Sequence, residues 1–261
     1  MSDTETATAP AVLTERRDNI LLITLNRPEA RNAVNGDLAQ GVADALDELD
    51  DTQELQVGIL TGAGKGFSAG MDLKAFVTGE RPWIGDRGFA GIVQRASRKP
   101  LIAAIEGFAV AGGFEIALAC DLIVASKGAK LGIPEVKRSL VAAGGALLRL
   151  PQRLPYGIAM EMALTGDPMP AERLHDLGVV NRLAEPGGAV DTAIELAAQI
   201  TPNAPLSLVA SKEILQRQYD WTQEEFWAKQ GEIAAPVMTS QDAQEGAKAF
   251  AEKREPVWQG K

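Results

Sequence analysis

The sequence has few of the residues on which metal, disulfide and nucleophile chemistry depend. It holds one cysteine, Cys120, and one histidine, His175. A lone cysteine excludes an internal disulfide and is typical of a reducing compartment, so we expect a cytoplasmic protein. One histidine and one cysteine are too few for a zinc site, and we expect no metal. Because the HExxH pattern is missing as well, acid–base chemistry is left to carboxylates.

Long apolar runs and a surplus of positive charge are absent too. No run approaches the roughly 20 apolar residues of a membrane span. The opening MSDTETATAP lacks the basic start and apolar stretch of a signal peptide. We therefore expect no membrane association and a disordered N-terminal tail over residues 1–11. The formal net charge of −9 argues against a nucleic-acid partner.

The glycine-rich stretch TGAGKGFSAGMDLKAF, residues 61–76, lies where a phosphate-binding loop would follow a strand. A Walker loop needs glycine at the position of Ile59, and Ser or Thr at that of Gly66. A dinucleotide fingerprint that starts at Gly62 needs glycine in place of Phe67. Both nucleotide interpretations fail on spacing, and a flexible turn remains an alternative.

Hydrophobic patterns alternate between strand-like and helix-like segments. Strands are predicted at 19–27, 56–61 and 101–107. Asn35 is a suitable cap for a helix with apolar residues on one face, and 111–126 is predicted as a helix that runs into another strand. Further helices are predicted at 156–164, 171–177, 189–200, 205–217, 222–233 and 240–253. The order indicates an α/β core over 12–200 and a helical C-terminal region over 201–261.

The segment IAAIEGFAVAGGFEIALACD places a glycine pair where a strand gives way to a helix. Backbone N–H groups at a helix start have no intrahelical acceptor, and the helix dipole adds positive charge there. Gly112 therefore stands where a developing anion is favoured, with Glu115 in the first helical turn. Close packing of small residues, with Glu115 as an ordinary first-turn carboxylate, is the alternative.

A second carboxylate, Glu135, follows a short apolar strand in KLGIPEVK. Pro134 has no N–H to pair, so we expect Glu135 in a loop. A solvated loop glutamate is the alternative.

Together these residues resemble the crotonase, or enoyl-CoA hydratase/isomerase, superfamily. Five segments carry the resemblance in order: SAGMDLK (68–74), GFAVAGGFEIALACD (107–121), GIPEVK (132–137), MALTGDPM (162–169) and AFAEKREPVW (249–258). Each is weak alone, but five in order at family spacing are specific, and the resemblance runs from about Val12 to the C-terminus. It implies an α/β fold of repeated ββα units with C-terminal helices that build a homotrimer, often doubled to a hexamer.

The resemblance also implies a mechanism. It assigns the backbone N–H groups of Met71 and Gly112 to an oxyanion site for the thioester oxygen of an acyl-CoA substrate. It makes Glu115 the base that deprotonates water and Glu135 the acid that protonates the α carbon. Retention of both glutamates favours an enoyl-CoA hydratase. No separate cofactor is implied, because coenzyme A is part of the substrate.

Substrate-binding residues follow from the same resemblance. Those expected to contact coenzyme A are Arg27, Ala30, Arg31, Ala33, Ala69, Asp72, Leu73, Lys74 and Lys253. Those expected in the acyl pocket are Trp83, Phe89, Ile92 and Ala143. Exposed cations that serve solubility, and aromatic residues that serve packing, are the alternatives.

The sequence departs from many hydratases after the second glutamate. They read PGAGGTQRL, whereas the run from Ala142 to Leu150 here is AAGGALLRL, so Ala143 replaces a glycine. This run and the C-terminal segment look closer to carnitinyl-CoA dehydratases. Carnitinyl-CoA dehydration or enoyl-CoA isomerisation is therefore the alternative reaction, and a non-catalytic RNA-binding protein is a third possibility that the net charge disfavours.

Overall fold

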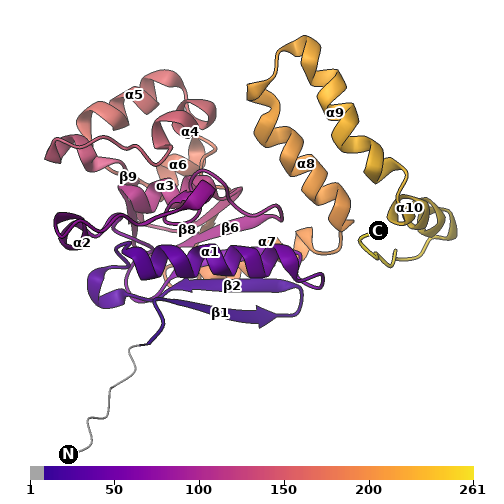
Figure 1. Ribbon diagram of the computed structural model, residues 1–261, viewed down its shortest axis with the longest axis horizontal. Coiled ribbons are helices and arrows are strands. Elements are labelled where there is room, and N and C mark those ends of the chain that lie inside the picture. The colour runs from indigo at the N-terminus through magenta and orange to yellow at the C-terminus, as the bar shows by residue number, and fades with distance from the viewer. Residues whose placement is uncertain (1–8) are drawn as a thin grey trace, which may run out of the picture.

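A six-stranded sheet forms the centre of the computed structural model, which describes residues 9–261 (Figure 1). Its strands, in spatial order, are β1 (Val12–Arg17), β2 (Ile20–Leu25), β3 (Val57–Gly62), β6 (Leu101–Ile105), β8 (Leu122–Ser126) and β11 (Arg182–Ala184). β1 runs antiparallel to β2, and the other pairs are parallel. The predicted strands at 19–27, 56–61 and 101–107 correspond to β2, β3 and β6, whereas the edge strand β1 was not predicted.

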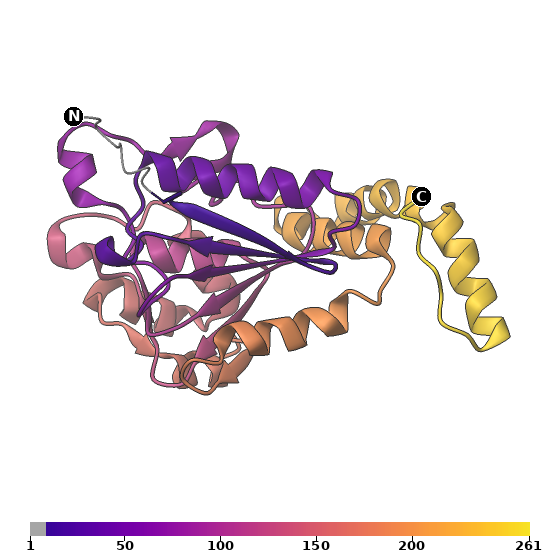
Figure 2. The same ribbon diagram turned by 90° about the horizontal axis from the view of Figure 1, so that it is seen from below.

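Both faces of this sheet are buried, because apolar side chains alternate between two clusters. Leu21 and Ile23 of β2 join the larger cluster, while Ile20 and Leu22 join the smaller one. Helix α1 (Gly36–Asp51) covers the first face and α7 (Ala189–Ile200) the second, as Figure 2 shows. Asn35 caps α1 as predicted, because its side chain accepts a hydrogen bond from the backbone N–H of Leu38.

A smaller sheet lies beside the first and carries the elements that later form the site. It contains β7 (Phe108–Val110), β9 (Lys130–Gly132) and β10 (Met169–Pro170). β7 leads directly into helix α3 (Gly112–Ala119), and β9 leads into the 3-10 helix η3 (Pro134–Arg138). Glu135, expected in a loop, therefore lies in a short 3-10 helix.

The remaining elements surround this core. They are η1 (Pro28–Ala30), α2 (Leu73–Val77), β4 (Trp83–Ile84), η2 (Gly85–Arg87), β5 (Gly88–Phe89), α4 (Ala146–Arg153), α5 (Tyr156–Thr165) and α6 (Ala171–Asp176). Of the tail predicted over residues 1–11, the first eight residues lie outside the described chain. Pro10 and Ala11 are held by Asn26, whose side-chain and backbone N–H groups donate to their carbonyls.

The last three helices extend from the core as an arm (Figures 1 and 2). They are α8 (Pro205–Arg217), α9 (Gln223–Met238) and α10 (Gln241–Glu252), with the 3-10 helix η4 (Gln218–Asp220) between the first two. Lys212 of α8 attaches the arm to the core through an ion pair of 2.7 Å with Asp121. Within residues 9–261, no helix is long and apolar enough to cross a membrane.

Candidate active site

Two backbone N–H groups from separate segments meet beside helix α3. Val34 forms a parallel bridge with Met71, in which its N–H donates to Gly70 and its carbonyl accepts from Asp72. This pairing leaves the N–H of Met71 itself without a hydrogen bond among the described residues. Gly112 is the first residue of α3, so its N–H has no intrahelical acceptor either.

The two segments approach each other so closely that only glycine fits between them. A Cβ on Gly70 would lie 2.7 Å from the amide nitrogen of Gly112, and one on Gly113 would lie 2.2 Å from the carbonyl oxygen of Ser68. Ala111 has φ 53° and ψ −134°, a strained conformation immediately before the helix. The structure thus brings Gly70, which precedes Met71, against Gly112, so that the segments carrying these two N–H groups are neighbours.

Ser68 and Asn32 hold this arrangement, and sequence reasoning missed both. The hydroxyl of Ser68 donates to the carbonyl of Asn32 at 2.8 Å and accepts from the N–H of Gly70 at 3.1 Å. The buried side chain of Asn32 donates to the carbonyls of Ala63 and Gly66. A Ser within a glycine-rich stretch is too common a pattern to identify such a contact beforehand.

Glu115 lies in the first turn of α3 with its residue 4% exposed. Its Oε1 accepts a hydrogen bond of 3.1 Å from the N–H of Ala146, the first residue of α4. Burial raises the pKa of Glu115, while the N–H groups of Ala146 and Gly144 and the positive charge of Arg149 oppose that rise. The ionised form of Glu115 therefore has specific partners.

Glu135 differs from Glu115 in its hydrogen bonding. Its Oε2 is buried and has no hydrogen-bond partner within residues 9–261. Burial raises the pKa of Glu135 to about 7, its own backbone N–H lowers it, and the charge of Glu115 raises it further. Because a charge on Glu115 disfavours a second charge nearby, the protonated form of Glu135 is favoured below a pH of about 7.

The chemical capacity of the site follows from these four groups. Two unpaired N–H groups can stabilise an oxygen that gains negative charge. A carboxylate and a carboxylic acid beside them can remove one proton and supply another. The site is thus equipped for addition or elimination next to a carbonyl.

The predicted acyl-pocket residues fall into different positions. Phe89 lies against the oxyanion donor, since a Cβ on Gly112 would be 2.6 Å from its ring. Trp83 is 46% exposed and packs edge to face on Phe89, with ring centroids 5.3 Å apart. Ile92 is fully buried in the main core, and Ala143 is exposed in the turn before α4.

Several residues expected to bind coenzyme A are occupied by contacts within the chain. Arg27 donates to the carbonyl of Ala33 and forms a 3.0 Å ion pair with Asp72. Asp72 also caps α2 by accepting from the N–H groups of Lys74 and Ala75. The N–H of Ala69 donates to the carbonyl of Arg31, and that of Ala30 to the carbonyl of Arg27. The side chains of Arg31, Leu73 and Lys74 are exposed.

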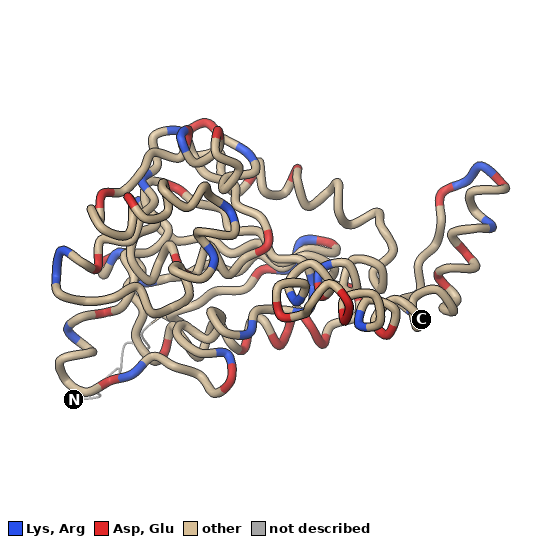
Figure 3. The backbone as a smooth tube through the Cα atoms, turned by 90° about the horizontal axis from the view of Figure 1, so that it is seen from above, with Lys and Arg blue, Asp and Glu red and all other residues tan. Residues whose placement is uncertain are grey.

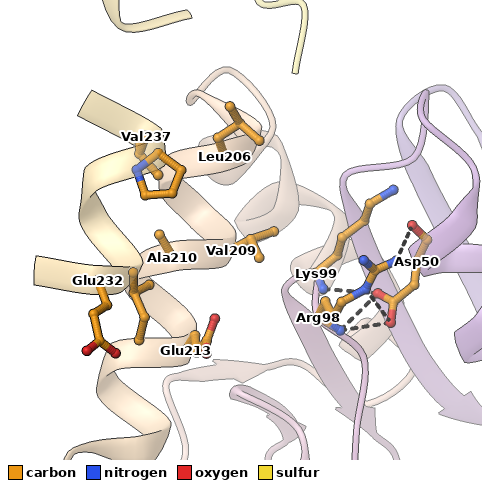
Figure 4. Close-up of a pocket in the computed structure, with 11 residues that line it drawn as sticks. Asp50, Arg98, Lys99, Leu206, Val209, Ala210, Glu213, Glu232 and Val237 are labelled. Carbon is orange, nitrogen blue, oxygen red and sulfur yellow. Dashed lines mark hydrogen bonds and ion pairs between the residues drawn. The ribbon is translucent and has the colours of Figure 1, made fainter. Parts of the chain in front are cut away.

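Lys253 lies apart from these residues within one chain. It follows α10 at the end of the arm, whereas α2 lies at the opposite end of the molecule in Figures 1 and 2. A cleft of about 440 Å³ between the arm and the core is also remote from the glutamates, and is lined by Val209, Ile233 and Arg98 among others (Figure 4). Acidic and basic residues are interspersed along the chain rather than gathered by sign (Figure 3).

Comparisons with known proteins identify the family of this chain. The sequence matches the family described as Enoyl-CoA hydratase/isomerase over residues 15–261. The structure is similar to an enoyl-CoA hydratase from Mycobacterium tuberculosis H37Rv, with a TM-score of 0.94 and 58% identity over 97% of this chain and 100% of that one. A carnitinyl-CoA dehydratase from Mycobacterium avium 104 gives a TM-score of 0.78 and 45% identity over 97% of this chain and 100% of that one.

A curated relative is similar over nearly its whole length. The carnitinyl-CoA dehydratase of Salmonella enteritidis PT4 is 44% identical over 254 residues, which are 94% of this chain and 97% of the relative. The expected fold is confirmed by the solved structures. The chain therefore belongs to the enoyl-CoA hydratase/isomerase family of the crotonase superfamily, as an enzyme of the hydratase or dehydratase type.

Proposed function

We propose that the protein is an enoyl-CoA hydratase, which adds water across the 2,3 double bond of a fatty enoyl-CoA thioester. The observation that carries this proposal is the contrast between the two glutamates. Hydration needs one carboxylate to take a proton from water and one carboxylic acid to give a proton to carbon. The carboxylate of Glu115 accepts a hydrogen bond from the N–H of Ala146. Glu135 has a pKa of about 7 and keeps its proton below that pH.

The reaction would use each group once. Glu115 deprotonates the water that attacks C3, and the thioester oxygen gains negative charge as an enolate forms. The N–H groups of Met71 and Gly112 hold that oxygen, and loss of one such donor typically costs about 10²–10³ in rate. Glu135 then protonates C2. Ala146 and Gly144 keep Glu115 in place throughout.

Some of the residues expected at the coenzyme A site would contact it directly, and others hold the loop that contacts it. Arg31 and Lys74 are the exposed cations on the core that suit its phosphates. The ion pair of Arg27 with Asp72 instead supports the loop around Ala33. Lys253 reaches such a site only from a neighbouring subunit, which is consistent with a homotrimer or hexamer.

Carnitinyl-CoA dehydration is a second candidate, favoured by the carnitinyl-CoA dehydratases that are 44–45% identical to this chain. It requires the same pair of glutamates in reverse. The enoyl-CoA hydratase from Mycobacterium tuberculosis is 58% identical to this chain, more than the carnitinyl-CoA dehydratases are, and this supports the first candidate. The exposed ring of Trp83 beside Phe89 is the feature that could accept a quaternary ammonium group.

A direct assay separates the two candidates. The purified protein is given crotonyl-CoA, a longer 2-enoyl-CoA and crotonobetainyl-CoA at equal concentrations. We expect hydration of the first two with a kcat/KM well above that for crotonobetainyl-CoA. Turnover of crotonobetainyl-CoA alone would establish the second candidate, and turnover of none would refute both.

A further inference from the structure

Helix α4 carries a cation that contacts both the turn before α4, which holds Glu115, and the segment that forms the wall of the site. Nη2 of Arg149 donates to the carbonyl of Val93 at 2.6 Å, and Nη1 donates to the carbonyl of Gly144 at 3.5 Å. Val93 follows Phe89 in the chain, at the end of the segment from Trp83 to Val93, here named the wall segment. Gly144 is in the turn that holds Glu115.

The turn before α4 is shaped around this guanidinium group. Gly145 has φ 102°, and a Cβ on it would lie 2.1 Å from Nη1 of Arg149. A Cβ on Gly144 would lie 2.5 Å from Oε2 of Glu115. The two glycines therefore let the backbone pass between the arginine and the glutamate, so that each side chain contacts the turn from one side.

The guanidinium group of Arg149 has no carboxylate at ion-pair distance. Within residues 9–261 it forms no ion pair, and its side chain is only partly exposed. A partly buried cation without a carboxylate at contact distance is costly unless a nearby charge compensates it. Burial and the charge of Arg153 lower the pKa of Arg149, and the charge of Glu115 is the carboxylate charge that opposes this.

We propose that Arg149 is a positioning residue that fixes Glu115 against the wall segment and keeps it ionised. It does so by joining Val93 to the turn at Gly144, rather than by touching substrate. This inference rests on the proposed function for the role of Glu115 as the base. The alternative is that Arg149 only stabilises the packing of α4.

Arg153 provides a matched control on the same helix. It lies one turn after Arg149, is also partly buried, and donates to the carbonyls of Leu118 and Cys120 at 3.0 and 3.2 Å. These carbonyls belong to the C-terminal end of α3, away from Glu115. Loss of Arg153 should therefore weaken packing without changing the environment of Glu115.

The test compares Arg149→Met, Arg149→Lys and Arg153→Met with the wild type. The titration of the Glu115 carboxyl is followed by ¹³C NMR of labelled glutamate, assigned with Glu115→Gln, so that it does not depend on any substrate. In Arg149→Met the midpoint should move to higher pH, because the opposing cation is gone. In Arg149→Lys the charge remains, and the midpoint should stay close to that of the wild type.

Activity provides the second readout. The kcat/KM for crotonyl-CoA should fall about tenfold to a hundredfold in Arg149→Met, as expected when a reacting group loses its position. In the pH profile of kcat/KM for Arg149→Met, the acidic limb should move to higher pH, as the midpoint of Glu115 does. Arg153→Met should lose thermal stability but keep the kcat/KM and the pH profile of the wild type. A folded Arg149→Met with an unmoved midpoint would overturn this proposal. A wild type that hydrates no enoyl-CoA would instead overturn the proposed function. The effect of Arg149 on Glu115 would then be tested by the titration alone.

Discussion

At the scale of single residues, the two glutamates differ in what surrounds each carboxyl group. Ala146 donates a hydrogen bond to Glu115, whereas Oε2 of Glu135 is buried without one. Burial raises the pKa of both, but the N–H groups of Ala146 and Gly144 and the charge of Arg149 oppose that rise at Glu115, whereas the charge of Glu115 adds to it at Glu135. This asymmetry gives each glutamate a separate task.

Substitution of either glutamate by glutamine should abolish most hydration. We expect Glu115→Gln and Glu135→Gln each to lose roughly 10² or more in kcat, as is typical for a positioned acid or base. Because the two act as a unit, the double variant should be far less than multiplicatively worse. Circular dichroism checks that the nearly isosteric variants fold. Near-normal turnover by one variant would remove that residue from the mechanism.

Met71 tests whether a backbone group is what matters in the glycine-rich stretch. Met71→Leu and Met71→Ala keep the N–H and should retain most activity. Met71→Pro has no N–H and should lose about 10²–10³ in kcat, because one oxyanion donor remains. Binding of the coenzyme A product and thermal melting are measured on the same proteins. Substantial turnover by a folded proline variant would reduce the stretch to a simple turn.

At the scale of elements, helices were predicted best where local signals define both ends. Helices α7 and α8 have the predicted bounds, 189–200 and 205–217. α9 continues to Met238, beyond the predicted end at 233, even though Pro236 in its last turn has no N–H to donate. The strand β1 escaped prediction because its side chains are mostly exposed and show no clear apolar alternation.

The site was predictable only as far as the family motifs reach. Glu115, Glu135, Met71 and Gly112 were identified by resemblance, and the structure brings Gly70, which precedes Met71, against Gly112. The contact of Ala146 with Glu115 spans distant segments and has no local sequence pattern. For Arg27 the resemblance suggested a contact with coenzyme A, but the structure pairs its side chain with Asp72.

The junction of β7 and α3 should not tolerate a methyl group at Gly113. In Gly113→Ala the new Cβ would meet the carbonyl oxygen of Ser68 at 2.2 Å and push the two oxyanion segments apart. We expect a loss of about 1–3 kcal/mol in the free energy of unfolding and a large loss of kcat. Both are measured, by denaturant unfolding and by enoyl-CoA hydration.

Gly157 of α5 is the matched control, because a Cβ there meets no atom within 4 Å. Gly157→Ala should raise stability by about 0.5–1 kcal/mol, since glycine disfavours the helix. Equal effects of the two substitutions would contradict the close approach at Gly113.

At the scale of the whole molecule, the arm leaves apolar side chains uncovered. Trp227 is 67% exposed and Phe250 is 87% exposed, whereas Trp221 and Phe226 partly cover each other. Soluble monomers seldom leave large apolar patches in water. We therefore expect a trimer or hexamer, and light scattering that finds only a 27.7 kDa species would contradict this.

Lys253 connects assembly with substrate binding. If it reaches coenzyme A from a neighbouring subunit, Lys253→Ala should raise the KM for crotonyl-CoA by about tenfold to a hundredfold, since a hydrogen bond to a charged group is worth about 1.5–3 kcal/mol. The kcat should change little, because the residue is remote from the glutamates. Lys261→Ala, at the C-terminal residue, is the matched control. An unchanged KM in a Lys253→Ala trimer would exclude the contact.

The pH dependence of kcat/KM for crotonyl-CoA hydration tests the division of labour between the glutamates most directly. Burial raises the pKa of Glu135 to about 7, so its proton is present below that pH and lost above it. Hydration by the wild type should therefore decline as the pH rises through about 7, and should also decline in acid as Glu115 becomes protonated. Glu135→Gln should lack the alkaline decline. A wild-type rate that rises through pH 7 to a plateau would contradict the account.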